Sequence, residues 1–171
     1  MRALGRVVGV LGALWWLAGC GADVVRIEVT ESGQAGGMAL SFPGMESFGS
    51  SLGRALGDED VKPGDVDSMR VERVELALLS QGGLTEDLGF LQQVRFLVAA
   101  DGMGATVLAE RAGIPEGART VELEVTPELD LKPFLKAGGM RIEIDAELAF
   151  PPPDVVELEA TFKIRVDVNV V

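Results

Sequence analysis

Few side chains of this sequence can do covalent or acid–base chemistry. The 171 residues contain no histidine and no tyrosine, and Cys20 is the only cysteine. A Ser-His-Asp triad, a Cys-His pair and histidine ligation of a metal or haem are therefore excluded. No phosphate-binding loop of the GxGxxG or Walker type is present. A carboxylate pair and a Ser-Lys arrangement are the remaining routes to an enzyme.

Carboxylates gather in two groups. The first comprises Asp58, Glu59, Asp60, Asp65 and Asp67, and the second comprises Glu147, Asp154, Glu157 and Glu159. Oxygen ligands suit calcium, and two close carboxyls suit glycoside hydrolysis. The first group does not have EF-hand spacing, and the second alternates with apolar residues as the wet face of a sheet does. We interpret both as solvated surface and predict no metal site and no cofactor.

The N-terminus has the layout of a secretory signal peptide. Arg2 and Arg6 give it a positive start, an apolar run of 12 residues covers 7–18, and small residues follow. A membrane-spanning helix needs about 20 apolar residues, so this run is too short to cross a bilayer. We predict that residues 1–19 are removed.

Leu17-Ala18-Gly19-Cys20 ends this segment and resembles a bacterial lipobox. The resemblance implies that Cys20 receives a diacylglyceryl group and becomes the first residue of a lipidated N-terminus, 20–23. A thiol is a suitable nucleophile, and each buried methylene of a lipid contributes about 0.8 kcal/mol to anchoring. Residue 21 is not the Asp associated with inner-membrane retention, so a Gram-negative source implies the outer membrane. An ordinary cleaved signal with a chance cysteine is the alternative.

The mature chain is strongly acidic. Without residues 1–19 it keeps 13 Lys and Arg against 27 Asp and Glu, a formal charge of −14. Such a surface repels nucleic acid and anionic lipid, so we expect no nucleic-acid partner. Both tryptophans lie in the signal segment, which leaves phenylalanine as the only aromatic residue of the mature domain.

Alternation of apolar and polar residues predicts strands through most of the mature chain. The predicted strands cover 25–29, 66–79, 94–98, 105–109, 121–125, 140–150 and 156–170. The large apolar residues of 69–78 change from odd to even positions near Glu72–Arg73, which predicts a β-bulge there. A helix is the alternative for 66–74. In contrast, residues 31–65 are rich in Gly, Ser, Met and acidic residues. We interpret them as a Gly/Ser-rich insertion, compatible with a short strand at 38–42 and a short helix at 48–56.

The two C-terminal alternating segments, 140–150 and 156–170, flank the three prolines at 151–153. A hairpin between them would set Glu143 opposite Lys163, which is a favourable pair. The same register brings like charges together elsewhere along the two segments. A crossover between two sheets is therefore the alternative.

Seven or eight strands, regular turns and no long helix predict one antiparallel β-sandwich domain over 24–171. The stretches RVERVELALLS, DLGFLQQVRFLVAA, MRIEIDAELAFPPP and FKIRVDVNV resemble immunoglobulin-like domains of uncharacterised bacterial lipoproteins in their strand rhythm. The buried Trp and the paired Cys of antibody domains are missing. A closed β-barrel uses the same alternation and is the alternative.

These features predict an interaction or structural module of the cell envelope without catalytic activity. Its expected partners are the membrane, through a lipid on Cys20, and an unknown protein. The alternative is a carrier of an apolar ligand in a barrel or sandwich cavity, with residues 38–57 as a lid. A cavity of about several hundred Å³ lined by Phe and Leu would favour the carrier. An enzyme with a carboxylate site ranks third.

Overall fold

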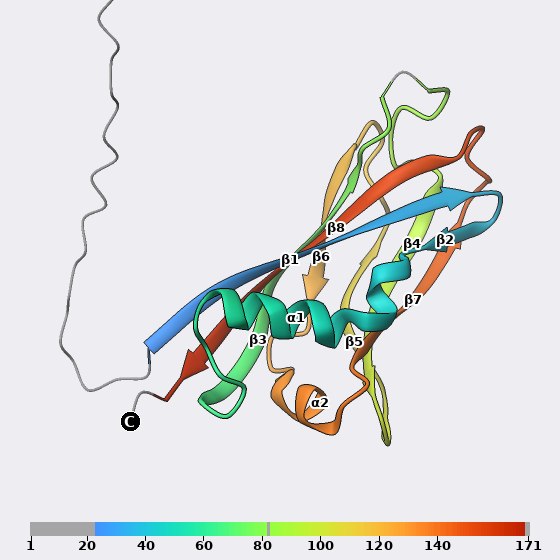
Figure 1. The fold of residues 1–171 in the computed structure, drawn as a ribbon. Helices are drawn as coiled ribbons and strands as arrows, with labels where there is room; N and C mark the ends of the chain where they lie inside the picture. Colours follow the sequence, from blue (N-terminus) through green and yellow to red (C-terminus); the bar gives the residue numbers. More distant parts are fainter. Residues whose placement is uncertain (1–22, 82, 170–171) are drawn as a thin grey trace, which may run out of the picture.

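The computed structural model describes residues 23–81 and 83–169 (Figure 1). The predicted signal peptide, the lipobox and Cys20 lie outside these residues. The elements in chain order are β1 (Asp23–Gly36), β2 (Ala39–Ser41), the 3-10 helix η1 (Pro43–Ser47), α1 (Phe48–Asp58), β3 (Val66–Leu78), β4 (Leu91–Ala100), β5 (Met103–Ala112), β6 (Thr120–Val125), α2 (Lys132–Ala137), β7 (Arg141–Leu148) and β8 (Val156–Val168).

The eight strands form a single antiparallel sheet that curls into a nearly closed barrel. Their order is β2-β1-β8-β3-β6-β5-β4-β7. The predicted antiparallel β class is confirmed, but the two-sheet, immunoglobulin-like sandwich is wrong. A sandwich needs a break in the hydrogen-bonded ladder, whereas here β3 pairs with both β8 and β6 and keeps the sheet continuous. Long twisted strands in a continuous sheet coil around a core instead of dividing into two layers.

The barrel does not close through strand pairing. The end strands of the sheet, β2 and β7, share no ladder, and η1 and α1 fill the opening between them. The Gly49 N–H donates to the Met140 carbonyl oxygen at 3.0 Å and so fixes the start of α1 beside β7. The large apolar side chains of this stretch are all buried, namely Phe42, Met45, Phe48, Leu52 and Leu56. This stretch is therefore part of the core.

Phenylalanine rings fill the centre of the barrel. Phe162 on β8 lies 5.0 Å from Phe48 of α1 and 5.6 Å from Phe96 of β4, measured between ring centroids. Phe42 adds an edge-to-face contact with Phe96 at 6.0 Å. Along β8 the inward side chains are buried from Val156 to Val168, as the alternation predicts. The interior is therefore packed with side chains.

The segment 31–65, expected as an insertion, begins inside β1, which continues to Gly36. Its inward positions carry a charged or small residue at Glu31, Gly33 and Ala35. A Cβ on Gly33 would lie 2.4 Å from the Phe42 ring, so the missing side chain makes room for that ring. The rest of the segment supplies β2, η1 and α1.

The strand register excludes the hairpin, one of the two arrangements left open for the C-terminal segments. β7 pairs with β4, while β8 lies between β1 and β3, so β7 and β8 are not neighbours. Lys163 consequently lies opposite Glu28 of β1, and the pair with Glu143 that a hairpin would make is not formed. The bulge is confirmed by a register shift between Val71 and Arg73, and the helical alternative for 66–74 is wrong.

Replacing Gly49 with alanine is expected to lower the free energy of unfolding by about 1–3 kcal/mol. The added Cβ would lie 2.9 Å from the Met140 Cβ and 3.1 Å from its carbonyl oxygen, and both belong to the chain segment that enters β7. Either α1 moves away from β7 or the backbone shifts. Urea unfolding followed by circular dichroism measures this change.

Gly53→Ala is the matched control, because Gly53 lies one turn further along the same helix. No atom outside its own neighbourhood lies within 4 Å of an added Cβ there. Alanine's higher helix propensity should then raise the free energy of unfolding by about 0.5–1 kcal/mol. Equal losses in both variants would contradict the docking of α1 against β7.

Candidate functional site

The strand ends assemble a cluster of loops at one end of the barrel. β1 ends beside the start of β8, β8 starts beside the end of β3, and β4 starts beside the end of β7. We name this end the distal pole and define it as residues 36–39, 79–81, 83–90, 113–119 and 149–155. β1 begins at the opposite end, with Asp23 opposite Val168. Figure 1 shows the distal loops at the upper right and the start of β1 at the lower left.

Large apolar side chains are exposed at the distal pole. Those exposed there, with their exposed fractions, are Met38 (64%), Leu79 (42%), Leu84 (77%), Phe150 (52%) and Val155 (68%). In the described residues only one other large apolar side chain is exposed, Val24, near the opposite end. Solvent-exposed apolar side chains gathered in one place are typical of a docking surface.

Asp154 connects two of the distal loops. Its carboxylate accepts hydrogen bonds from the Leu84 N–H at 2.9 Å, from the Thr85 N–H at 3.1 Å and from the Thr85 hydroxyl. The hydroxyl bond, helped by the two N–H bonds, lowers the pKa of Asp154 below its ordinary value. Asp154 thus stays ionised at neutral pH and holds the 83–85 segment against the proline loop.

Arg119 and Asp87 connect the loop 113–119 to the loop between β3 and β4. The Arg119 guanidinium donates to the carbonyl oxygens of Glu86 at 2.6 Å, Ser80 at 2.6 Å and Leu78 at 3.3 Å. The Asp87 carboxylate accepts from the N–H groups of Gly89 at 2.8 Å and Gly117 at 3.1 Å. These contacts fix the loops relative to one another, and a preformed surface loses less conformational entropy when it binds a partner.

The distal pole has an acidic rim. Its charged residues are Glu86, Asp87, Glu116, Asp154 and Arg119. The single cation, Arg119, already donates to three backbone carbonyls, whereas Glu86 and Glu116 are exposed. The surface therefore combines apolar side chains with excess negative charge.

Two shallow grooves open at this end of the barrel. One, of about 250 Å³, is lined mainly by Leu84, Phe90, Phe150 and Pro153, with acidic residues at its edge. The other, of about 380 Å³, runs between β1, β2 and β8 and includes Leu79. Both are open to solvent, so they suit side chains of a partner better than an enclosed small molecule.

A larger groove, of about 720 Å³, follows the unpaired gap between β2 and β7. Its walls carry Phe42, Ile142 and Ile144, together with polar residues that include the ion pair of Arg141 with Glu143 at 2.8 Å. The groove lies on the surface, and the barrel interior behind it is filled by the phenylalanine core. Moving the segment 38–57 as a lid would expose that core.

The two carboxylate groups do not form a metal site within the described residues. No three His, Cys, Asp or Glu side chains lie close enough there to hold an ion. Glu147 lies on β7 and Glu159 on β8, which are far apart in the sheet order. Asp154 is engaged by the N–H groups of Leu84 and Thr85.

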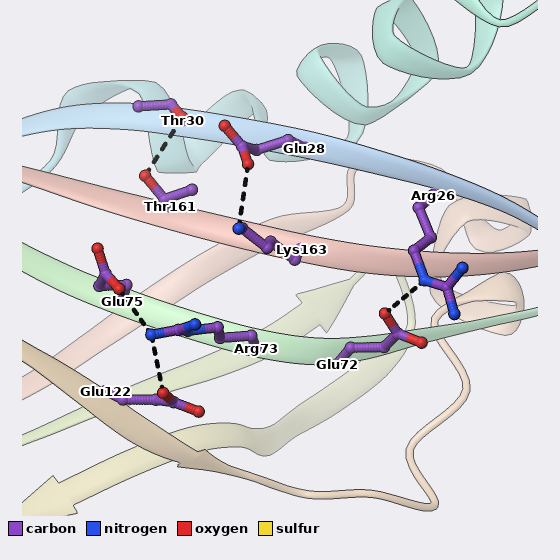
Figure 2. A network of polar contacts seen from close by, with 9 residues as sticks. All are labelled: Arg26, Glu28, Thr30, Glu72, Arg73, Glu75, Glu122, Thr161 and Lys163. Atoms are coloured by element: carbon purple, nitrogen blue, oxygen red, sulfur yellow. Dashed lines mark hydrogen bonds and ion pairs between the residues drawn. The ribbon is translucent and has the colours of Figure 1, made fainter. Parts of the chain in front are cut away.

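The outer wall of β1, β8, β3 and β6 pairs its own charges (Figure 2). Arg26 contacts Glu72 at 3.1 Å, and Arg73 lies between Glu75 and Glu122 at 3.0 Å from each. All of these side chains are well exposed, so each pair contributes at most about 1 kcal/mol. On this wall several exposed charged side chains contact one another, whereas exposed large apolar side chains gather at the distal pole.

Comparison with known proteins finds no relative: no family model matches the chain, and neither a curated protein nor a solved structure matches it. In the described part of the chain, no helix has the length and apolar composition that spanning a bilayer requires.

One sequence feature could have indicated the distal pole, namely large apolar residues beside glycine or proline in turns. Leu84 follows Gly83 in a turn and is not within an alternating strand pattern, whereas Phe150 ends the alternating segment predicted as the strand 140–150. β7 ends at Leu148, so Phe150 lies beyond the strand and is exposed, although the alternation predicts it within the strand. An apolar residue in such a turn has no sheet face to bury it. Only the assembled barrel shows that several of these turns meet.

Proposed function

We propose that this protein is a lipid-anchored interaction module of the cell envelope without catalytic activity. The observation that carries the proposal is the gathering of exposed apolar side chains at the distal pole, remote from Asp23. The lipobox-like sequence supports the anchor, because the resemblance implies a lipid on Cys20. In a Gram-negative source the membrane would be the outer membrane.

The two ends of the barrel suit two different tasks. Asp23 follows Cys20 by three residues, and three residues extend over at most about 11 Å. A lipid on Cys20 thus keeps the β1 start of the barrel close to the bilayer. The distal pole then faces away from the membrane, where a partner can reach it.

The available chemistry favours binding over catalysis. Without histidine, an enzyme here would need close carboxylates or a Ser-Lys arrangement. Of the second carboxylate group, Glu147 and Glu159 lie on strands that are far apart in the sheet, and Asp154 is bound to backbone N–H groups. Exposed apolar side chains do not perform acid–base chemistry, but they do supply the buried contacts of protein interfaces.

Replacing Cys20 with alanine is expected to move the protein from the membrane fraction to the soluble fraction of the cells that make it. The thiol that accepts the lipid would be gone, whereas the barrel core lies within 23–169 and should stay folded. Fractionation with immunodetection measures the shift, and labelling with an alkyne fatty acid tests for the lipid itself.

Asp23→Asn is the control, since it alters a nearby residue and leaves the lipobox intact. It should stay in the membrane fraction and take the fatty acid. A Cys20→Ala protein that remains with the membrane, or a wild-type protein that takes no fatty acid, would refute the anchor.

A further inference from the structure

We infer that the distal pole binds a protein segment that combines apolar side chains with lysine or arginine. This inference rests on the proposed function, in which that end of the barrel is the docking end. It assigns a chemical character to the partner.

The apolar part of the surface includes side chains from different loops. Leu84 and Phe150 line the same groove, although they belong to different loops. Val155 lies next to the β1–β2 turn at the same end, because a Cβ on Gly36 would be 3.1 Å from its Cγ2. Apolar side chains of a partner can therefore contact Leu84 and Phe150 together, and burying such contacts is what gives an interface its affinity.

The exposed carboxylates of the distal pole favour a partner with positive charge. Glu86 and Glu116 are exposed, and neither carboxylate belongs to an ion pair of the described residues. Asp87 connects their loops through Gly89 and Gly117, so both carboxylates border one surface. Opposite charge on a partner accelerates encounter and fixes its orientation, while like charge is strongly unfavourable.

The same charge disfavours the other occupants of an exposed apolar surface. A second copy of this chain would bring its own four carboxylates against these four, with only the occupied Arg119 on each side. The phosphates of a membrane leaflet carry the same sign as the rim, and so do nucleic acids. A cationic, partly apolar protein segment meets both features.

The test places a photo-crosslinking amino acid at position 84 or 150 of the full-length chain, in the cells that make it. Leu84 and Phe150 are exposed, so neither change should unfold the barrel. Position 24, exposed near the opposite end, is the matched control. We expect protein adducts from positions 84 and 150 and no protein adduct from 24, and mass spectrometry should locate the cross-link in a net cationic, apolar segment.

The charge is tested by a double variant, Glu86→Gln with Glu116→Gln, made in the Leu84 cross-linking chain. It should lower the adduct yield at least about fivefold, as loss of steering charges lowers association rates. Glu110→Gln with Glu124→Gln removes the same charge from the barrel wall, where these residues pair across β5 and β6, and should leave the yield unchanged. Thermal unfolding of the purified Leu84 cross-linking chain and its two double variants verifies that all three remain folded.

The absence of adducts at 84 and 150, or a cross-link to an acidic segment, to lipid or to a second copy, would overturn the inference. Equal yields from the two Gln pairs would overturn it as well. The Cys20→Ala fractionation is independent of these readouts. If the fractionation refutes the lipid anchor, the cross-linking test of the partner is still valid. If the cross-linking test fails, the lipid anchor is not affected.

Discussion

Replacing Phe162 with alanine is expected to lower the free energy of unfolding by about 3–5 kcal/mol. The ring is fully buried and lies between Phe48 and Phe96. It joins β8, one of the strands paired on both edges, to α1 on one side and to β4 on the other. Removing it leaves a cavity where the helix that fills the gap meets the barrel wall, and a packed interior cannot fully collapse into such a space.

Equilibrium urea unfolding of Phe162→Ala, followed by circular dichroism, measures this loss. Phe150→Ala serves as the control, because it removes the same ring from an exposed position at the distal pole. It should change the free energy of unfolding by no more than about 0.5 kcal/mol. Similar losses in the two variants would contradict a core centred on Phe162.

Gly33→Ala is expected to lower the free energy of unfolding by about 1–3 kcal/mol, through crowding of the core. Its added Cβ would lie 2.4 Å from Cδ1 of Phe42, and three atoms of that ring would be closer than 2.7 Å. Phe42 cannot simply turn away, since its ring also packs edge-to-face on Phe96. Either β1 bends outwards or the chain entering η1 loses its place in the core.

The same substitution in a Phe42→Ala background is the decisive comparison. Phe42→Ala alone should destabilise the protein, but it also removes the ring that the new methyl group would strike. The cost of Gly33→Ala should then fall by about 1–2 kcal/mol, a coupling of the size expected for residues in contact. An unchanged cost in the two backgrounds would show that the glycine is needed for another reason.

Strand identity is readable from the sequence wherever the inward positions of a strand carry large apolar residues. The last strand predicted, 156–170, alternates without interruption, and β8 buries the inward side chains of Val156–Val168. The bulge near Glu72–Arg73 was predictable for the same reason, because the apolar parity changes there and the register shifts with it. In these segments, local pattern and tertiary environment agree.

The second half of β1 shows where that agreement ends. Its inward positions, Glu31, Gly33 and Ala35, do not look like core residues, and the alternation disappears from the sequence. Gly33 has no side chain because the Phe42 ring, which comes from outside the strand, occupies the space beside it. Glu31 lies against Gly44 of η1. No analysis of residues 31–36 alone can find a partner that arrives from another segment.

The distal pole is a similar case at the level of function. Each exposed apolar residue there is unremarkable in its own turn, and the sequence contains many isolated apolar residues near glycine or proline. Their meeting depends on the order β2-β1-β8-β3-β6-β5-β4-β7, which brings four distant loops to one end. Asp154, Asp87 and Arg119 then connect three of those loops, 79–90, 113–119 and 149–155.

By itself, the sequence determined most of the strands, the acidic charge and the missing histidine chemistry, because these follow from composition or from residues that are close together in the chain. The lipid on Cys20 stays a prediction. Only the tertiary structure decided between sandwich and barrel, separated β7 from β8, and assembled the distal pole. Those outcomes depend on which strands share hydrogen bonds, and the same alternation of side chains is compatible with several pairings. The choice among them is made by the packing of the whole core, in which Phe42, Phe48, Phe96 and Phe162 from four segments fill one interior.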